Sequence, residues 1–208
     1  MPSEHPDRPS PQGTLRCLFR ASGLVLLVAV AVVAVLLSGC SNVKTYSDPD
    51  YGFSFQYPKA WDLKDTEPDK LPAGVSKSVG AMDQAGSGTE DYALDFVSVD
   101  IYNLGPDSGL TTETIQSEFE VWLEEAGSTD STFRVADAPT AVTVGGLEGY
   151  KATYTYTDGD FQVRCTEYWL LKGEVMYDLY TQATEDNWAD NQKTFDAFVS
   201  SFKPGAGD

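Results

Sequence analysis

Histidine and basic residues are scarce in this chain. Its 208 residues include one histidine, His5, and 14 lysine or arginine residues against 32 aspartate or glutamate residues, which gives a formal net charge of −18. His5 lies in an N-terminal segment that we expect to be removed, so the mature chain excludes Ser-His-Asp and Cys-His nucleophiles and imidazole metal sites. An acidic surface repels the phosphate backbone, and we predict no nucleic-acid binding.

Long hydrophobic runs are also missing, with one exception near the N-terminus. Fourteen apolar residues span Leu24–Leu37 and follow Arg16 and Arg20, whereas a membrane-spanning helix needs about 20 residues. Residues 1–39 therefore fit a signal peptide better than an uncleaved anchor. Cleavage before Cys40 leaves 169 residues, of which 11 are basic and 30 acidic, so the mature net charge is −19.

The end of the apolar run carries a more specific motif. Leu37-Ser38-Gly39-Cys40 resembles the lipobox of bacterial lipoproteins, in which the cysteine thiol receives a diacylglycerol and becomes the mature N-terminus. Two acyl chains on one residue are enough for stable anchoring. We therefore expect a protein attached through Cys40 to the extracytoplasmic face of the cell membrane. The alternative is an ordinary cysteine that merely follows a signal peptide.

Cysteines are too few for an intrachain disulfide. Cys17 leaves with the signal peptide, Cys40 is lipidated, and Cys165 then has no partner. An extracytoplasmic location permits disulfides, so the stability of this domain must come from packing instead. We expect Cys165 to be a small buried residue, because a redox-active thiol needs an accessible, electropositive setting.

The mature chain divides into three parts. We expect the lipidated Cys40 and a polar tether over residues 40–51, one globular domain over 52–204, and a tail over 205–208. Asp48-x-Asp50-x-Gly52 has the opening spacing of a calcium loop, but Lys59 stands where the final glutamate belongs, so an ordinary turn is preferred. Alternating apolar segments predict strands at 52–58, 75–82, 92–102, 133–135 and 141–144.

Two amphipathic segments predict helices. The first is capped by Thr111 or Thr112 and stops at Gly127, and its apolar stripe comprises Ile115, Phe119, Trp122, Leu123 and Ala126. The second starts after Thr184 and buries Trp188, Phe195, Phe198, Val199 and Phe202. Strands interrupted by only two helices predict an α+β fold, in which helices cover a largely antiparallel sheet.

Residues 149–182 predict a three-stranded antiparallel meander. Asp158-Gly159 between alternating segments is typical of a two-residue hairpin turn. A loop formed by these two residues places Tyr150 opposite Glu167. One face of the hairpin is then apolar and the other polar, and Glu167 is its one charged residue at an inward position.

The second turn of the meander decides the other neighbour of Glu167. A three-residue loop over 171–173 places Tyr177 opposite it, whereas a two-residue loop would oppose it to Asp178 and bring like charges together. We prefer the first register. Glu167, between Tyr150 and Tyr177, is therefore a candidate structural acid or ligand residue, and it needs a hydrogen-bond donor if it is buried.

The opening strand resembles the start of PsbP-like proteins. The matching residues are Tyr46, Asp50, Gly52-Phe53-Ser54-Phe55, Tyr57-Pro58 and Trp61, followed later by Gly149, Ala152, Tyr154, Gly173, Tyr177, Phe195, Phe198 and Phe202. The resemblance covers residues 46–202 and implies an α/β/α sandwich that acts as an accessory or binding module. Photosystem members have roles tied to calcium and chloride, but no matching ligand motif stands in this sequence, and we carry over no functional residue.

Two hypotheses of function follow. The first is a non-enzymatic, lipid-anchored module of the cell envelope that serves an envelope protein or captures an envelope ligand, in a groove for sugar or peptide lined by the meander tyrosines. The second is a hydrolase that uses a pair of carboxylates on wall polysaccharide. We identify no cofactor or metal motif, and weak calcium binding by the acidic surface is a third hypothesis.

Overall fold

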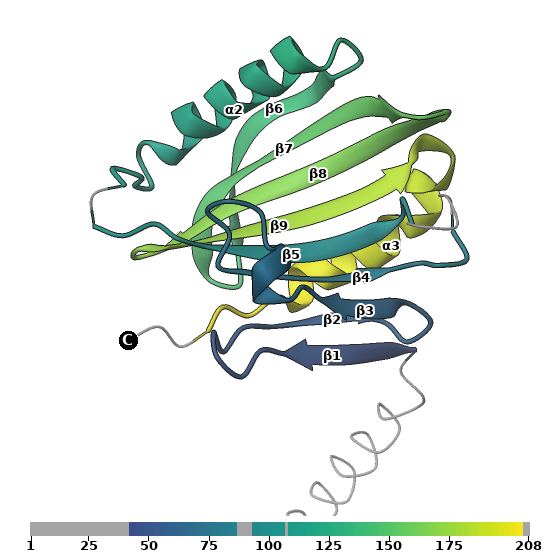
Figure 1. The fold of residues 1–208 in the computed structure, drawn as a ribbon, viewed down its shortest axis with the longest axis horizontal. Helices are drawn as coiled ribbons and strands as arrows, with labels where there is room; N and C mark the ends of the chain where they lie inside the picture. The colour runs from purple at the N-terminus through teal and green to yellow at the C-terminus, as the bar shows by residue number, and fades with distance from the viewer. Residues whose placement is uncertain (1–41, 87–92, 107, 206–208) are drawn as a thin grey trace, which may run out of the picture. The chain divides into compact units, whose positions relative to one another are not determined.

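The chain folds around a seven-stranded antiparallel sheet (Figure 1). The structure is a computed structural model and describes residues 42–86, 93–106 and 108–205. Across the sheet the strands follow in the order β3 (Asp62–Asp65), β4 (Lys77–Met82), β5 (Phe96–Asn103), β9 (Val175–Thr184), β8 (Phe161–Lys172), β7 (Leu147–Asp158) and β6 (Arg134–Val144). The described part of the chain also contains the helices α2 (Ile115–Thr129) and α3 (Glu185–Ser201), the short 3-10 turn η1 (Pro68–Lys70) and a separate pair of strands, which confirms the predicted α+β class.

The two faces of the sheet differ because side chains alternate along each strand. On one face β5 buries Val97, Val99 and Ile101 in a core shared with α3, which contacts β9 and β8. On the other face β5 presents Ser98 and Asp100, and α2 packs there against β6 and β7. Helices thus cover both faces of the sheet, as the resemblance implied.

Residues 43–47 form a strand rather than part of a tether. β1 (Val43–Ser47) pairs antiparallel with β2 (Ser54–Pro58), and the compact unit begins at Asn42. The tether interpretation of residues 40–51 is therefore wrong, except for Cys40 and Ser41, which lie outside the described residues. The sequence predicted β2 but missed β1 because most of β1 is exposed and lacks a regular apolar alternation.

Asp48 closes the turn between β1 and β2. Its carboxylate accepts hydrogen bonds from the Asp50 and Tyr51 amides at 2.9 and 2.7 Å and from the Tyr46 hydroxyl at 2.9 Å, and Lys77 Nζ lies 3.3 Å away. Burial alone would raise the pKa of Asp48, but these hydrogen bonds outweigh it and lower the pKa. The carboxylate is thus occupied by its own turn, as the turn interpretation expects.

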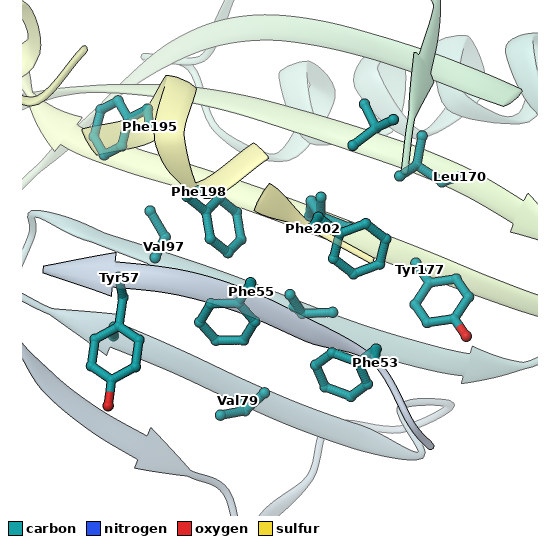
Figure 2. Close-up of a cluster of buried hydrophobic side chains, with 14 of the residues drawn as sticks. Phe53, Phe55, Tyr57, Val79, Val97, Leu170, Tyr177, Phe195, Phe198 and Phe202 are labelled. Carbon is teal, nitrogen blue, oxygen red and sulfur yellow. The ribbon is translucent and has the colours of Figure 1, made fainter. Parts of the chain in front are cut away.

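The main core lies between β2, the sheet and α3 (Figure 2). Phe55 of β2 packs edge-on against Phe198 of α3, with 5.2 Å between ring centroids, and Phe53 lies 6.4 Å from Tyr177 of β9. The second predicted helix is confirmed, since α3 starts directly after Thr184. The aromatic residues on its inner side provide the apolar burial that holds this layer to the sheet.

The end of the described chain is also part of the fold. Lys203 pairs with Ser54 of β2, and Gly205 is buried and accepts a hydrogen bond from the Lys172 ammonium group. The predicted tail over 205–208 is therefore wrong at Gly205, and its remaining residues lie outside the described part.

α2 starts and stops later than the sequence predicted. Its N-cap position is Thr114, and Thr111 instead accepts hydrogen bonds from the Glu113 and Thr114 amides just before the helix. Gly127 lies within the last turn and does not end the helix, which continues to Thr129. The predicted apolar stripe is confirmed, with Ile115, Phe119 and Leu123 buried.

The first meander register is shifted from the prediction. Asp158 pairs with Phe161, so the loop residues are Gly159 and Asp160. Gly159 has a φ of 57° and occupies the first central position, as in type II′ turns, whereas the prediction placed glycine second. Glu167 consequently lies opposite Ala152 rather than Tyr150. A shift of two residues leaves every side chain on its predicted face.

The second meander register is wrong by an odd number of residues. Lys172 pairs with Val175, because Gly173 again takes the first position of a two-residue loop, with a φ of 57°. Glu167 therefore lies opposite Tyr180, and Tyr177 turns to the α3 face. At the far edge of the sheet, the predicted strands 133–135 and 141–144 are one strand, β6, whose pairing is irregular near Asp137.

Candidate functional site

A groove of about 840 Å³ lies on the sheet face that carries α2. Ser78, Gly80 and Ser98 of β4 and β5 line one part of it. A Cβ atom at Gly80 would come within 2.9 Å of the Val97 carbonyl oxygen, so the strands approach closely at a position without a side chain. The groove exists because α2 covers the β6–β7 side of the sheet face. The small residues of β4 and β5 do not fill the space beside it.

Aromatic side chains surround the groove. Those that line it are Phe96, Tyr102, Trp122, Tyr154, Tyr156, Trp169 and Tyr180. Phe119 of α2 stacks on Trp169 of β8, with ring centroids 4.4 Å apart and an interplanar angle of 8°, and Trp122 lies 5.5 Å from Tyr154. These contacts fix the position of α2 over the sheet, so that one wall of the groove is rigidly packed.

Three carboxyl groups lie on the sheet side of the groove, among these aromatic side chains. Asp100 of β5 and Asp178 of β9 are directly opposite each other, and Glu167 of β8 lies diagonally beyond Asp178. Glu167 is 4% exposed and Asp178 is 9% exposed. Three neighbouring acids on the central strands, with aromatic side chains around them, are unusual for a sheet face that serves packing alone.

Glu167 is held by two donors. The Tyr154 hydroxyl donates to Oε2 at 2.8 Å, and the Trp169 indole donates to Oε1 at 2.7 Å. Burial raises the pKa of Glu167, although these two hydrogen bonds oppose the shift. The expected hydrogen-bond donors are therefore present, but they come from Tyr154 and Trp169 rather than from Tyr150 or Tyr177.

The two aspartates are less well satisfied. Oδ1 of Asp100 and Oδ1 of Asp178 are buried and accept no hydrogen bond from the described residues. Burial raises the pKa of both carboxyl groups, and the nearby charges of Glu167 and Asp100 raise the pKa of Asp178 further. Two buried carboxyl oxygens on this face of the sheet thus have no donor among the described residues.

A polar network continues the site toward the end of β9. Gln182 accepts hydrogen bonds from the Tyr156 and Tyr180 hydroxyls at 2.8 and 2.7 Å and donates to the Leu94 carbonyl oxygen at 3.0 Å. Cys165 is fully buried with its sulfur 2.8 Å from the Tyr180 hydroxyl, and burial raises the pKa of the thiol. The expected burial of Cys165 is confirmed, and its setting is not that of an activated thiol.

The sequence identified one member of this site. Tyr150 lies on the same face as Glu167 but opposite Trp169, and Tyr177 packs on the other face against Phe53 and Phe202, so neither contacts Glu167 as predicted. Cys40 lies outside the described residues. Asp100 and Asp178 were missed, and the available signal was an acidic residue in the middle of each of two otherwise apolar or aromatic strand segments.

Neither a membrane span nor a metal cluster is found in the described ranges. Over residues 42–86, 93–106 and 108–205, no helix is long and apolar enough to cross a membrane. Within the same ranges, no group of three or more His, Cys, Asp or Glu residues is arranged to hold a metal ion.

The fold and the groove together define an α/β/α module with a concave acidic and aromatic site on one face. The chain belongs to the family of PsbP-like proteins, which matches residues 33–204. The resemblance of its opening strand to that family is thereby confirmed. No curated protein matches the chain significantly.

Two solved structures share the fold. The solution structure of cyanobacterial PsbP from Synechocystis sp. PCC 6803 is 20% identical, with a TM-score of 0.55, and the match covers 80% of this chain and 95% of that one. The crystal structure of LpqN, described as involved in cell envelope biogenesis of Mycobacterium tuberculosis, is 11% identical, with a TM-score of 0.52, covering 79% and 92%. At these identities the likeness concerns the fold alone.

Proposed function

We propose that this protein is a lipid-anchored, extracytoplasmic binding module of the cell envelope, and that it binds its ligand in the groove over β4, β5, β9 and β8. The observation that carries the proposal is the pair of buried, unsatisfied Oδ1 atoms of Asp100 and Asp178 in a groove lined by aromatic side chains. Its volume of about 840 Å³ falls within the range of about 300–1,000 Å³ that is usual for small-molecule sites.

The arrangement of the acids favours binding over hydrolysis. Glycosidases place their two carboxyl groups about 5–5.5 Å apart or about 6.5–9.5 Å apart, so that sugar or water fits between them. Glu167 and Asp178 lie within hydrogen-bonding reach of each other. Both oxygens of Glu167 are also engaged by Tyr154 and Trp169, which leaves no free base at that position.

The anchoring part of the proposal rests on the sequence. The lipobox-like residues 37–40 follow an apolar run that is too short to span the bilayer. The described domain begins at Asn42, so a lipid on Cys40 would be separated from it by one residue, Ser41. The domain would then work close to the membrane surface, which fits the name of LpqN as a protein of cell envelope biogenesis.

The test of the groove uses Ser98→Trp, a substitution that fills the floor without changing the charge. The thermal stability of the purified full-length protein is measured in non-ionic detergent, with and without a small-molecule extract of the native envelope. Because a ligand that binds only the folded state raises the melting temperature, wild type should gain stability in the extract and Ser98→Trp should not.

Two results would overturn the proposal. Equal shifts for wild type and Ser98→Trp, or no shift for either, would show that the groove holds no envelope ligand. Release of reducing ends from purified wall polysaccharide by wild type, lost in Glu167→Gln, would instead establish the hydrolase.

A further inference from the structure

Three neighbouring carboxyl groups line the groove, and no ion pair joins them to a described basic side chain. Asp100 and Asp178 are cross-strand partners, and like charges at directly opposite positions of a sheet repel each other. The described residues also provide no donor for their buried Oδ1 atoms, and a buried acceptor without a partner is destabilising. A bound cation would allow both carboxyl groups to ionise without this repulsion.

Glu167 shapes this acidic pair without being free to bind. Its two oxygens already accept from Tyr154 and Trp169, and its carboxyl group reaches Asp178. Asp178 is therefore held on one side by Glu167, while its Oδ1 has no donor among the described residues. The described lining residues also include Asp158 and one basic residue, Lys64, so an anionic ligand is disfavoured.

The surroundings of the acids distinguish an organic cation from a metal ion. Calcium takes about six to eight oxygen ligands, whereas the orphaned acceptors here are two Oδ1 atoms. Around them stand the rings of Tyr102, Tyr180 and Trp169 and the side chain of Met176. Aromatic faces attract ammonium groups and pack against alkyl chains, and a bare metal ion uses neither property.

We propose that the groove binds a small organic cation, whose primary ammonium group pairs with the carboxyl groups of Asp100 and Asp178 that line it, while its alkyl stem packs against the aromatic side chains. This inference rests on the proposed function, because it names the ligand chemistry of the same groove. Diamines and amino sugars share the required ammonium group, and the groove volume of about 840 Å³ accommodates molecules of this size.

The experiment titrates the full-length protein with cadaverine, a five-carbon diamine, and follows tryptophan fluorescence and the heat of binding. Pentane-1,5-diol has the same stem without charge, and glucosamine presents an ammonium group on a sugar ring. Cadaverine should bind saturably at near-physiological salt, and pentane-1,5-diol should bind at least about tenfold more weakly, because charge-assisted hydrogen bonds are the stronger kind. Tighter binding of glucosamine than of cadaverine would assign the ammonium group to an amino sugar.

Variants separate the site from the general acidity of the protein. Asp178→Asn and Asp100→Asn each keep the side-chain shape and should weaken the binding of cadaverine by about tenfold or more. Glu118→Gln removes the same charge from an exposed position on α2 and should leave the affinity within about twofold. Circular dichroism of each variant verifies that it is folded, and the two aspartate variants test the same prediction independently.

Several results would overturn the inference. These are equal binding of the diol, equal loss in Glu118→Gln, no binding of either amine, or a calcium affinity above that of both amines that Asp178→Asn abolishes. If the envelope extract stabilises wild type but not Ser98→Trp, while neither amine binds, the proposed function stands. The inference that the ligand is an organic cation is then wrong. If the extract does not stabilise wild type and neither amine binds, both proposals fail.

Discussion

Asp100 of β5 and Asp178 of β9 face each other across an antiparallel strand pair in the centre of the sheet, and each has a buried carboxyl oxygen for which the described residues provide no donor. Ionisation of both carboxyl groups at this position is therefore unfavourable. Buried acids without donors are destabilising, and removal of one of them should reveal that cost.

Asp178→Asn should stabilise the ligand-free protein at neutral pH. The amide keeps the shape of the side chain, cannot ionise opposite Asp100 and can donate to Glu167 without first binding a proton. We expect a gain of about 1–3 kcal/mol, seen as a higher midpoint in urea unfolding. Glu118→Gln on the exposed face of α2 is the charge-matched control and should change stability by less than about 0.5 kcal/mol.

The advantage of Asp178→Asn should depend on pH. Burial and neighbouring charges raise the folded-state pKa of Asp178, and burial also raises those of Asp100 and Glu167. The folded state thus binds protons more tightly than the unfolded state, so wild-type stability from these groups is fully present below about pH 4 and is lost as pH rises through the folded pKa values. The difference between variant and wild type should be small at pH 4 and large at pH 8, and a constant difference would contradict this account.

Phe119→Ala should loosen α2 from the sheet. Phe119 is fully buried and stacks on Trp169, one wall of the groove. Loss of a buried phenylalanine costs about 3–5 kcal/mol, and the Trp169 environment should become more polar, with a red-shifted emission. Val121→Ala on the same helix is the control, because Val121 is 49% exposed and should cost less than about 0.5 kcal/mol. Unchanged emission in Phe119→Ala would show that α2 is held by other contacts.

Gly149→Ala and Gly127→Ala should have opposite effects. A Cβ at Gly149 would lie 2.0 Å from the Trp169 carbonyl oxygen in the neighbouring strand, whereas a Cβ at Gly127 makes an ordinary contact with Phe133 at 3.6 Å. Gly149→Ala should therefore prevent normal β7–β8 pairing. Gly127→Ala should stabilise α2 by roughly 0.5–1 kcal/mol. Thermal unfolding of the two variants checks both signs, and a Gly149→Ala protein with wild-type stability would contradict the close approach of β7 and β8.

Cys40→Ala should release the protein from the membrane. Without the thiol no diacylglycerol can be attached, and the precursor should disappear from the lipoprotein fraction. Mass spectrometry of the native protein should find an acylated Cys40 at its N-terminus. Cys165→Ala is the control, because Cys165 is buried in the sheet and its loss leaves the lipobox-like residues intact. An unmodified N-terminus at Cys40 would refute the anchor.

Local patterns in the sequence predicted the elements that depend on one stretch of chain. The apolar stripe of Ile115, Phe119 and Leu123 is buried as expected, and α3 begins after Thr184. The boundaries of α2 were less accurate, since Gly127 is accommodated inside the helix. β1 escaped detection because it pairs with β2 alone, so its side chains carry no clear alternation.

The positions of the two meander turns could not be predicted from the sequence pattern. Asp158-Gly159 and residues 171–173 each allow several loop choices that differ by one residue, and each choice satisfies the apolar alternation of its own strand. An odd shift turned Tyr177 away from Glu167, whereas an even shift kept Tyr154 on its side. The choice is made by packing of both sheet faces at once, which no single segment encodes.

The amino-acid sequence alone determined the acidity of the protein, its single histidine at His5 and the α+β class, because these depend on composition and on periodicity within single segments. The family was indicated by the resemblance of particular residues in the opening strand. Only the tertiary structure brought Asp100, Glu167 and Asp178 together beneath the aromatic side chains. Asp100 of β5 is far in the chain from the β8–β9 hairpin that carries Glu167 and Asp178, and their meeting depends on the order of strands in the sheet and on register. The groove itself arises because α2 packs toward the β6–β7 edge, a long-range contact that local propensity does not specify.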